Sequence, residues 1–258
     1  MPEHTVADIR SMFSRTDVDE LPQLIGRFAT DARPGVQDAC DAARKRVGRR
    51  DAELSRLESL TAVQADLHAR GVAVVAGVDE VGRGALAGPV SAAAVVLPVS
   101  VRIIGLNDSK KLTPEQREQL SAEIMQTALA VSIAHVSPEI IDRDGIAAAN
   151  THAMRKALLG LSLAPGHVLI DGLHVELGFP TTAIVRGDRF VAAIAAASIV
   201  AKVARDALMR ENDALFPAYG FAQNKGYGTL EHIEIIERCG PCPLHRMSFS
   251  PCSQQHLF

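Results

Sequence analysis

The chain has 258 residues, 47% of them hydrophobic, which is enough apolar material for one large core or for a core with an appendage. We expect neither a signal peptide nor a membrane span, and hence a cytoplasmic protein, because no apolar stretch of spanning length is free of charge. The formal net charge of −3 excludes a globally basic nucleic-acid-binding protein, so any surface for nucleic acid has to be local.

Residues 1–70 are charged, helical in pattern and poor in strand signals, so we predict a helical N-terminal extension ahead of a core domain at residues 71–258. Two basic runs, Arg44-Lys45-Arg46 and Arg49-Arg50, lie in this extension with acids interleaved. The interleaving favours a solvated helix face, and an arm that touches a phosphate backbone is the alternative.

The stretch from Val72 to Val90 carries the strongest chemical signal. Its apolar, β-branched start predicts a buried strand, which ends in two adjacent acids, Asp79 and Glu80. The glycine-rich turn Gly82-Arg83-Gly84 follows. Buried carboxylates are costly and a divalent cation commonly offsets them, whereas glycines let backbone N–H groups approach a phosphate. Acids that can bind a metal, followed by glycines whose N–H groups can bind the phosphate of a nucleic-acid backbone, indicate phosphodiester chemistry.

The middle of the chain alternates strands and helices. Strands are predicted at Val90–Leu97 and Leu129–Val136, with one helix between them and another at Ala147–Leu161. A polar loop at residues 107–112 precedes the first helix. Lys110 in that loop fits a phosphate contact or an ordinary solvated lysine equally well.

Two further predicted strands also deliver acids. His167–Ile170 is followed by Asp171, and Thr182–Val185 is followed by Arg186-Gly187-Asp188. Functional side chains collect at strand ends, where they can converge without breaking the ladder. A single acid in such a place is usually a turn or cap residue, but three of them favour a metal site.

The segment Phe190–Asn212 predicts one long helix whose alanines permit close approach to a sheet. Ser198, Lys202 and Asp206 recur four residues apart and form its polar stripe. Asp206 is a candidate for a fourth carboxylate at the site, although an ion pair with Lys202 or a plain surface acid is the favoured interpretation.

Tyr227 stands between two glycines, just before a helix that Thr229 caps. Such a tyrosine has little local packing, which suits stacking on a base or sugar, and a core-facing aromatic is the alternative. Further on, the tail from His245 to Phe249 is expected to pack back across the core.

The sequence Cys239-Gly-Pro-Cys242 matches the thioredoxin redox motif. It follows the helical pattern of Leu230–Arg238, however, and a helix C-terminus opposes a thiolate. A zinc site built from these two cysteines with His245 and Cys252 fits no structural zinc class. Free thiols in a tight loop are the favoured interpretation.

Taken in order, these motifs resemble bacterial type 2 ribonuclease H, the ribonuclease HII family, over about residues 72–250. Arg186 stands where the family more often has lysine, and the extension resembles that of the longer, Bacillus-like members. The matching segments are Asp79-Glu80-Val81-Gly82-Arg83-Gly84, Gly88-Pro89, Asp108-Ser109-Lys110-Lys111-Leu112, Asp171-Gly172, Arg186-Gly187-Asp188, Ala196–Lys202 and Lys225-Gly226-Tyr227-Gly228-Thr229.

This resemblance implies an α/β, RNase H-like fold with a five-stranded mixed sheet flanked by helices, plus the N-terminal helical extension. It implies two Mg²⁺ or Mn²⁺ ions and a backbone contact of the glycine turn to a ribose 2′-OH and its phosphate, with Tyr227 stacked on the following deoxyribose. The implied catalytic and metal-binding residues are Asp79, Glu80, Asp171 and Asp188. The predicted substrate-binding residues are Gly82, Arg83, Gly84, Lys110, Ser198, Lys202 and Tyr227.

By the same resemblance, the expected protein is an endoribonuclease. We also expect a monomer with no membrane partner. Its substrates would be RNA–DNA hybrids and DNA duplexes with single embedded ribonucleotides, cut on the 5′ side to leave a 3′-hydroxyl and a 5′-phosphate. The alternatives are another two-metal nuclease such as a junction resolvase, a non-catalytic hybrid-binding protein, and a thiol oxidoreductase.

Overall fold

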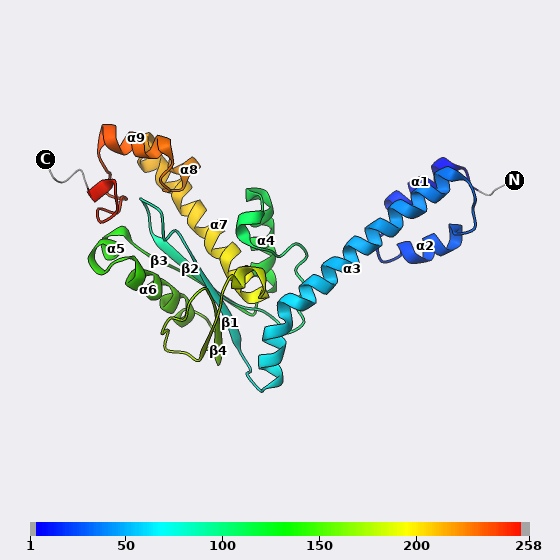
Figure 1. Ribbon diagram of the computed structural model, residues 1–258, viewed down its shortest axis with the longest axis horizontal. Helices are drawn as coiled ribbons and strands as arrows, with labels where there is room; N and C mark the ends of the chain where they lie inside the picture. The colour runs from blue at the N-terminus through cyan, green and yellow to red at the C-terminus, as the bar shows by residue number, and fades with distance from the viewer. Residues whose placement is uncertain (1–3, 254–258) are drawn as a thin grey trace. The chain divides into compact units, whose positions relative to one another are not determined.

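The computed structural model describes residues 4–253 and divides into two compact units, Met1–Glu58 and Ser59–Phe258 (Figure 1). The first unit contains α1 (Val6–Arg15), α2 (Leu21–Phe28) and most of α3 (Pro34–Ala69). The predicted domain limits, 1–70 and 71–258, remain a prediction. None of the described helices combines the length and apolarity that a bilayer crossing requires.

The first unit is held by a small apolar core and by its own ion pairs. Ile9, Phe13, Phe28 and Cys40 are among the buried residues of that core. Of the five basic residues in the two runs of the extension, three bind partners within this unit. Arg44 pairs with Asp41, Arg50 pairs with Asp19, and Arg46 donates to the carbonyl oxygens of Phe13 and Thr16.

The second unit is built on one five-stranded sheet with the order β3-β2-β1-β4-β5. The β1–β2 and β2–β3 pairs are antiparallel, whereas β1–β4 and β4–β5 are parallel, so the sheet is mixed and the predicted fold class is confirmed. The strands are β1 (Val75–Val81), β2 (Val90–Val96), β3 (Ala130–Val136), β4 (His167–Asp171) and β5 (Thr181–Ile184).

Helices cover both faces of this sheet, with α6 and α7 on opposite sides of it (Figure 1). The remaining short elements are the 3₁₀ turns η1, η2 and η3 and the helix α8. The bounds are η1 (Ser109–Lys111), α4 (Pro114–Thr127), α5 (Pro138–Asp144), α6 (Ile146–Leu159), η2 (Gly187–Arg189), α7 (Ala192–Leu215), η3 (Pro217–Tyr219), α8 (Phe221–Asn224) and α9 (Leu230–Cys239).

Alternation along β1 decides which side chains meet which helix. Ala76 and Val78 belong to the apolar cluster that Met154 of α6 completes. Val75 lies on the other face and packs against Ile194 of α7. Successive strand side chains point to opposite faces, so Gly77 and Asp79 share the α7 face with Val75.

Gly77 sets how closely α7 approaches the sheet. A Cβ atom at this position would lie 2.2 Å from the backbone carbon of Ala193. The Gln64 side chain, from the last turns of α3, accepts the Ala193 N–H at 3.0 Å and so satisfies one of the free donors at the start of α7. The backbone of α7 therefore packs directly against the backbone of β1 at Gly77.

Gly77→Ala is expected to destabilise the protein by about 3 kcal/mol or more, because β1 is held by its ladders to β2 and β4 and α7 can move away only by losing its packing on the sheet. Urea-induced unfolding followed by circular dichroism measures the change. Gly48→Ala is the matched control: no atom lies within 4 Å of its added Cβ, and we expect it to raise helix stability by about 0.5–1 kcal/mol. Equal stabilities for the two variants would contradict the close packing.

The C-terminal segment packs back on the core, as the sequence predicts. Leu244 accepts the Gly88 N–H at 2.8 Å, and the Arg246 N–H donates to Leu86 at 2.8 Å. Behind this ladder lies a buried cluster in which the Nε2 atoms of His232 and His245 are 3.1 Å apart. Both rings have lowered pKa values because of burial, and the neighbouring His232 helps to lower the pKa of His245 to about 4.

These histidines predict a loss of stability in mild acid. The unfolded chain takes up protons near the ordinary imidazole pKa of 6.5, whereas folded His245 resists protonation down to about 4. Between these values the unfolded state binds more protons, so the folded state loses stability as the pH falls. We expect His245→Gln, although less stable at pH 7.5, to lose less on going to pH 5 than the wild type does, by on the order of 1 kcal/mol. Identical pH slopes in urea titrations would contradict this expectation.

Candidate active site

The two acids of β1 lie inside the strand. Asp79 is paired with Ala93 of β2 and Glu80 with Ala92, so the ladder continues through both carboxylates. The Asp79 side chain is 6% exposed, and its Oδ1 accepts the Glu80 N–H at 2.8 Å. Its position on the α7 face brings it to Ser198, whose hydroxyl lies 2.9 Å from that of Ser109.

The third and fourth predicted acids are joined through a turn. Asp171 is the last residue of β4, and its Oδ1 accepts the Gly187 N–H at 2.6 Å. This bond holds η2, which carries the buried Asp188, against the end of β4. A Cβ at Gly187 would lie 2.6 Å from Ile194 Cδ1, so a larger residue in this turn would require the Ile194 side chain to shift.

The carboxylates repel one another in a poorly solvated setting. Burial and then the Glu80 charge raise the pKa of Asp79 well above its ordinary value, and Asp171 adds to this. Burial also raises the pKa of Glu80, against the opposing effect of Arg83. For Asp188, burial, then Asp108 and Asp171, raise the pKa. Asp171 is thus an electrostatic neighbour of all three other predicted acids.

Three of these acids open into a cleft of about 400 Å³, formed where β1 and β4 end beside α7. Asp188 is not among the residues that form its wall. The wall consists of Asp79, Glu80, Val81, Ser109, Lys110, Arg117, Asp171, Ser198, Lys202 and Tyr227. Carboxylates therefore face lysine and arginine side chains across a space open to solvent.

The chemistry of this donor set fits a hard divalent cation. The carboxylates supply oxygen ligands only, they lie in a partly buried site, and their mutual repulsion is what a bound cation offsets. Within residues 4–253, no three His, Cys, Asp or Glu side chains converge as closely as ligands around a single ion. The metal-binding role of the four acids therefore stays a prediction.

The glycine turn after β1 presents free backbone donors. Gly82 adopts φ +88, and a Cβ on it would lie 2.3 Å from Arg205 Nε. Gly84 is different, because its added Cβ would meet no atom within 4 Å. The N–H groups of Arg83 and Gly84 have no acceptor among the described residues, and the Arg83 side chain pairs with Glu80 at 3.2 Å.

Tyr227 lines the cleft and is half-buried, so it is not a core-facing aromatic. The guanidinium carbon of Arg205 lies 5.3 Å from its ring centroid, and Lys202 Nζ lies 5.6 Å from it. Lys202 also pairs with Asp206 at 2.8 Å, which is the predicted ion pair within the helix. The ring is therefore held at the cleft by cations.

Sequence reasoning missed Asp108 and the arginines around it. Asp108 is 1% exposed, accepts the Lys110 N–H at 2.9 Å and pairs with Arg189 at 3.2 Å. Burial alone would raise its pKa, but Lys110 and Arg189 together hold the pKa below its ordinary value. Arg117 donates to the carbonyls of the same loop. The signal in the sequence is the polar loop at residues 107–112, in which the pattern alone points only to Lys110.

The cysteines show none of the features of a reactive pair. Cys239 is exposed at the end of α9, whereas Cys242 and Cys252 are buried, and all are free thiols. Burial raises the pKa of Cys242 and of Cys252, which is the opposite of an activated thiolate. These observations agree with the interpretation of free thiols in a tight loop.

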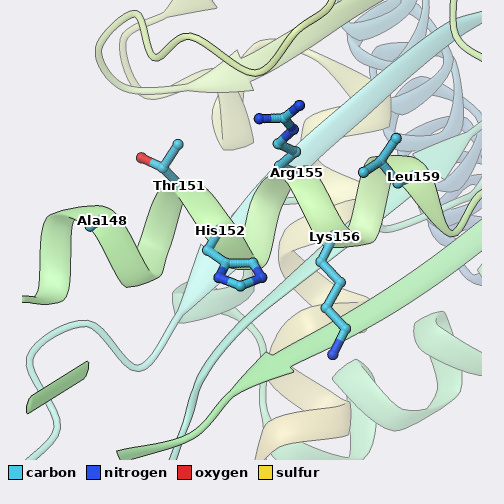
Figure 2. Close-up of a pocket in the computed structure, with 6 residues that line it drawn as sticks. All are labelled: Ala148, Thr151, His152, Arg155, Lys156 and Leu159. Carbon is cyan, nitrogen blue, oxygen red and sulfur yellow. The ribbon is translucent and has the colours of Figure 1, made fainter. Parts of the chain in front are cut away.

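A second hollow, of about 660 Å³, lies along the outer side of α6 (Figure 2). Figure 2 shows its side chains spreading away from one another around the helix, with Arg155 and Lys156 on different sides. No carboxylate is among them: they are Ala148, Thr151, His152, Arg155, Lys156 and Leu159. This hollow lacks the convergent polar groups of a catalytic site.

Comparison with known proteins gives a consistent result. The family model described as "Ribonuclease HII" matches residues 76–252, and that of the "Ribonuclease HII N-terminal domain" matches residues 5–68. Ribonuclease HII of Geobacillus kaustophilus is 44% identical over 251 residues, which cover 97% of this chain and 96% of that protein. Ribonuclease HII of Moorella thermoacetica is 54% identical over 198 residues, covering 76% and 96%. The crystal structure of ribonuclease H2 from Pyrococcus horikoshii OT3 superposes with a TM-score of 0.61 at 26% identity, covering 70% of this chain and 96% of that one.

Proposed function

This chain belongs to the ribonuclease HII family and is an RNase H nuclease, and from this premise we propose that it cuts DNA duplexes on the 5′ side of single embedded ribonucleotides as well as the RNA strand of RNA–DNA hybrids. The products are a 3′-hydroxyl and a 5′-phosphate, and the enzyme works as a cytoplasmic monomer. The observation that supports this most directly is the cleft that Asp79, Glu80 and Asp171 share with Lys110, Lys202 and Tyr227. The glycine turn follows Glu80 directly in the chain, and its Arg83 and Gly84 N–H groups have no acceptor among the described residues.

The family depends on divalent metal, and we assign its ions, Mg²⁺ or Mn²⁺, to Asp79, Glu80, Asp171 and Asp188. The chemistry that such a pair of ions would supply, when held by these acids, is activation of a water at neutral pH and stabilisation of the leaving 3′-oxygen. The chain's own contribution is to hold the acids apart in fixed places: the β1 ladder holds Asp79 and Glu80, and the Gly187 N–H holds Asp171.

Selectivity for a ribonucleotide is assigned to the backbone of the glycine turn. The 2′-OH is the group that distinguishes RNA from DNA at a given position. A side chain would keep the sugar away from this turn, whereas the N–H groups of Arg83 and Gly84 stand free beside the acids. Lys110, Lys202 and Arg117 supply positive charge along the cleft wall for the neighbouring phosphates, and Ser198 holds Asp79.

A direct assay tests this proposal. Three substrates are compared in Mg²⁺ and in Mn²⁺: a duplex with one ribonucleotide, its all-DNA twin and a four-way DNA junction. We expect one cut, 5′ to the ribonucleotide, with 3′-hydroxyl and 5′-phosphate ends, and no cutting of the other two. Cleavage of the junction would favour a resolvase, and metal-independent binding of the single-ribonucleotide duplex without cutting would favour a non-catalytic binding protein.

Gly84→Ala separates substrate contact from folding. We expect an unchanged melting temperature, because the added methyl group meets no protein atom and the residue does not adopt the left-handed region. We also expect kcat/KM at an embedded ribonucleotide to fall roughly 30-fold, because the methyl group lies where the sugar has to approach the backbone. Gly48→Ala, in α3, is the control and keeps full activity. Full activity in Gly84→Ala would contradict the assigned contact.

A further inference from the structure

The turn after β1 rests on two buried guanidinium groups. Arg205 of α7 and Arg246 of the C-terminal segment are each 0% exposed, although arginine is rarely buried without an acidic partner. Among the described residues, every hydrogen-bond acceptor of these two side chains is a backbone carbonyl oxygen. Arg246 donates to Gly82 (2.7 Å), Arg83 (2.9 Å) and Gly88 (3.0 Å), and Arg205 donates to Ala87 (3.1 Å), Pro89 (2.9 Å) and Lys225 (2.8 Å).

Neither guanidinium group forms an ion pair among residues 4–253. Two like charges in a dry site are costly, and an apolar side chain of similar volume would fill the space at lower cost. A guanidinium group differs from an apolar side chain in its rigid planar fork of donors, which can fix several carbonyls at once. What these arginines add is therefore the orientation of particular peptide groups.

The orientation of the carbonyls fixes that of the N–H groups. In a trans peptide the C=O and N–H bonds point in opposite directions, and the described chain has its cis peptide elsewhere, at Ser250-Pro251. Arg246 draws the carbonyls of Gly82 and Arg83 inward. The N–H groups of Arg83 and Gly84 belong to the same two peptide planes, so they are turned away from Arg246, and neither has an acceptor among the described residues.

Arg205 connects the same turn to the loop of Tyr227. It holds the Ala87 and Pro89 carbonyls at the end of the turn, and it also holds the Lys225 carbonyl at the base of the loop that carries Tyr227. Its guanidinium carbon lies 5.3 Å from the Tyr227 ring centroid. One buried side chain thus ties the glycine turn to the tyrosine.

We propose that Arg205 and Arg246 are positioning residues for ribonucleotide recognition: Arg246 turns the Arg83 and Gly84 N–H groups toward the substrate, and Arg205 fixes that turn relative to Tyr227. This inference rests on the proposed function, since it concerns the same substrate site. Both side chains act through the backbone and touch no reacting atom. Their removal therefore weakens the use of the glycine turn rather than the chemistry of the acids.

A double-mutant cycle between Arg246→Lys and Gly84→Ala tests the proposal. Lysine keeps the charge but cannot hold the Gly82, Arg83 and Gly88 carbonyls at one time. We expect each single variant to lower kcat/KM at an embedded ribonucleotide roughly 30-fold. We expect kcat/KM of the double variant to lie within about threefold of that of the less active single variant. If the two replacements acted independently, kcat/KM of the double variant would instead fall roughly 1,000-fold. Activities are measured well below each melting temperature and are referred to the folded fraction from circular dichroism.

Met154→Ala is the control for a purely structural role, because it removes a buried side chain from the α6 face of the sheet. It should lower the melting temperature, keep kcat/KM, and combine additively with Gly84→Ala. Additive losses for Arg246→Lys and Gly84→Ala, or full activity in Arg246→Lys, would overturn the proposal. If Arg246→Lys does not fold, the cycle is run with Arg205→Lys and Tyr227→Ala, where additivity overturns it in the same way. A wild-type enzyme that leaves the embedded ribonucleotide uncut would instead overturn the proposed function.

Discussion

Asp79→Asn is expected to lower kcat at least about 1,000-fold while leaving the fold intact and, in the absence of metal, at least as stable as the wild type. Asparagine has the shape of aspartate and can still accept the Glu80 N–H. Asparagine also removes the buried negative charge of Asp79, which Glu80 and Asp171 repel. The free energy of the folded state is therefore no longer raised by this repulsion and by the burial of the charge. A group kept at the expense of stability is typical of a functional site.

Metal linkage supplies a second readout for this variant. An ion that binds only the folded state raises the melting temperature, and the rise grows with affinity. Wild-type enzyme should therefore show a clear increase with Mn²⁺, and Asp79→Asn a much smaller one. Asp66→Asn, which removes an exposed carboxylate paired with Arg70 on α3, should respond like the wild type. Retained turnover in Asp79→Asn, or an unchanged response to Mn²⁺, would remove Asp79 from the proposed site.

Local sequence patterns were sufficient for the elements that carry the acids. The apolar runs indicate all five strands, and the alanine-rich segment indicates α7, with ends that differ by a few residues. The largest difference is at β1, predicted from Val72 but observed at Val75–Val81. An apolar run shows which residues are buried, but the end of a strand depends on how far the neighbouring strand continues to pair with it. Here β2 pairs with β1 beyond Asp79 and Glu80.

What the sequence could not predict are side chains whose partners lie far away along the chain. Arg205 and Arg246 bond to carbonyls 116 and 164 residues distant, at Pro89 and Gly82, and no local period marks such contacts. Each arginine is also adjacent in sequence to a residue for which the local pattern suggests a role. These neighbours are Asp206 of the polar stripe and His245 near the cysteines. Asp108 was missed for a related reason, because its closeness to Asp188 appears only once η2 folds against β4.

Tyr227→Ala is expected to change substrate preference more than any other single replacement in the cleft wall. Stacking of an aromatic ring on a nucleotide is worth about 1–3 kcal/mol, so we expect cleavage at a single embedded ribonucleotide to fall roughly 10- to 100-fold. A continuous hybrid offers the glycine turn several ribonucleotides to engage, so its cleavage should fall less. Comparing kcat/KM for the two substrates measures this difference.

Tyr227→Phe keeps the ring above Arg205 and Lys202 and should behave nearly as the wild type, since no hydrogen bond of the Tyr227 hydroxyl is found among the described residues. Equal losses on both substrates in Tyr227→Ala would mean that the ring supports the cleft wall and does not recognise the junction. Because Arg205 lies against this ring and also holds the glycine turn, a selective loss in Tyr227→Ala would place recognition of the ribose and of the following deoxyribose in one connected structure.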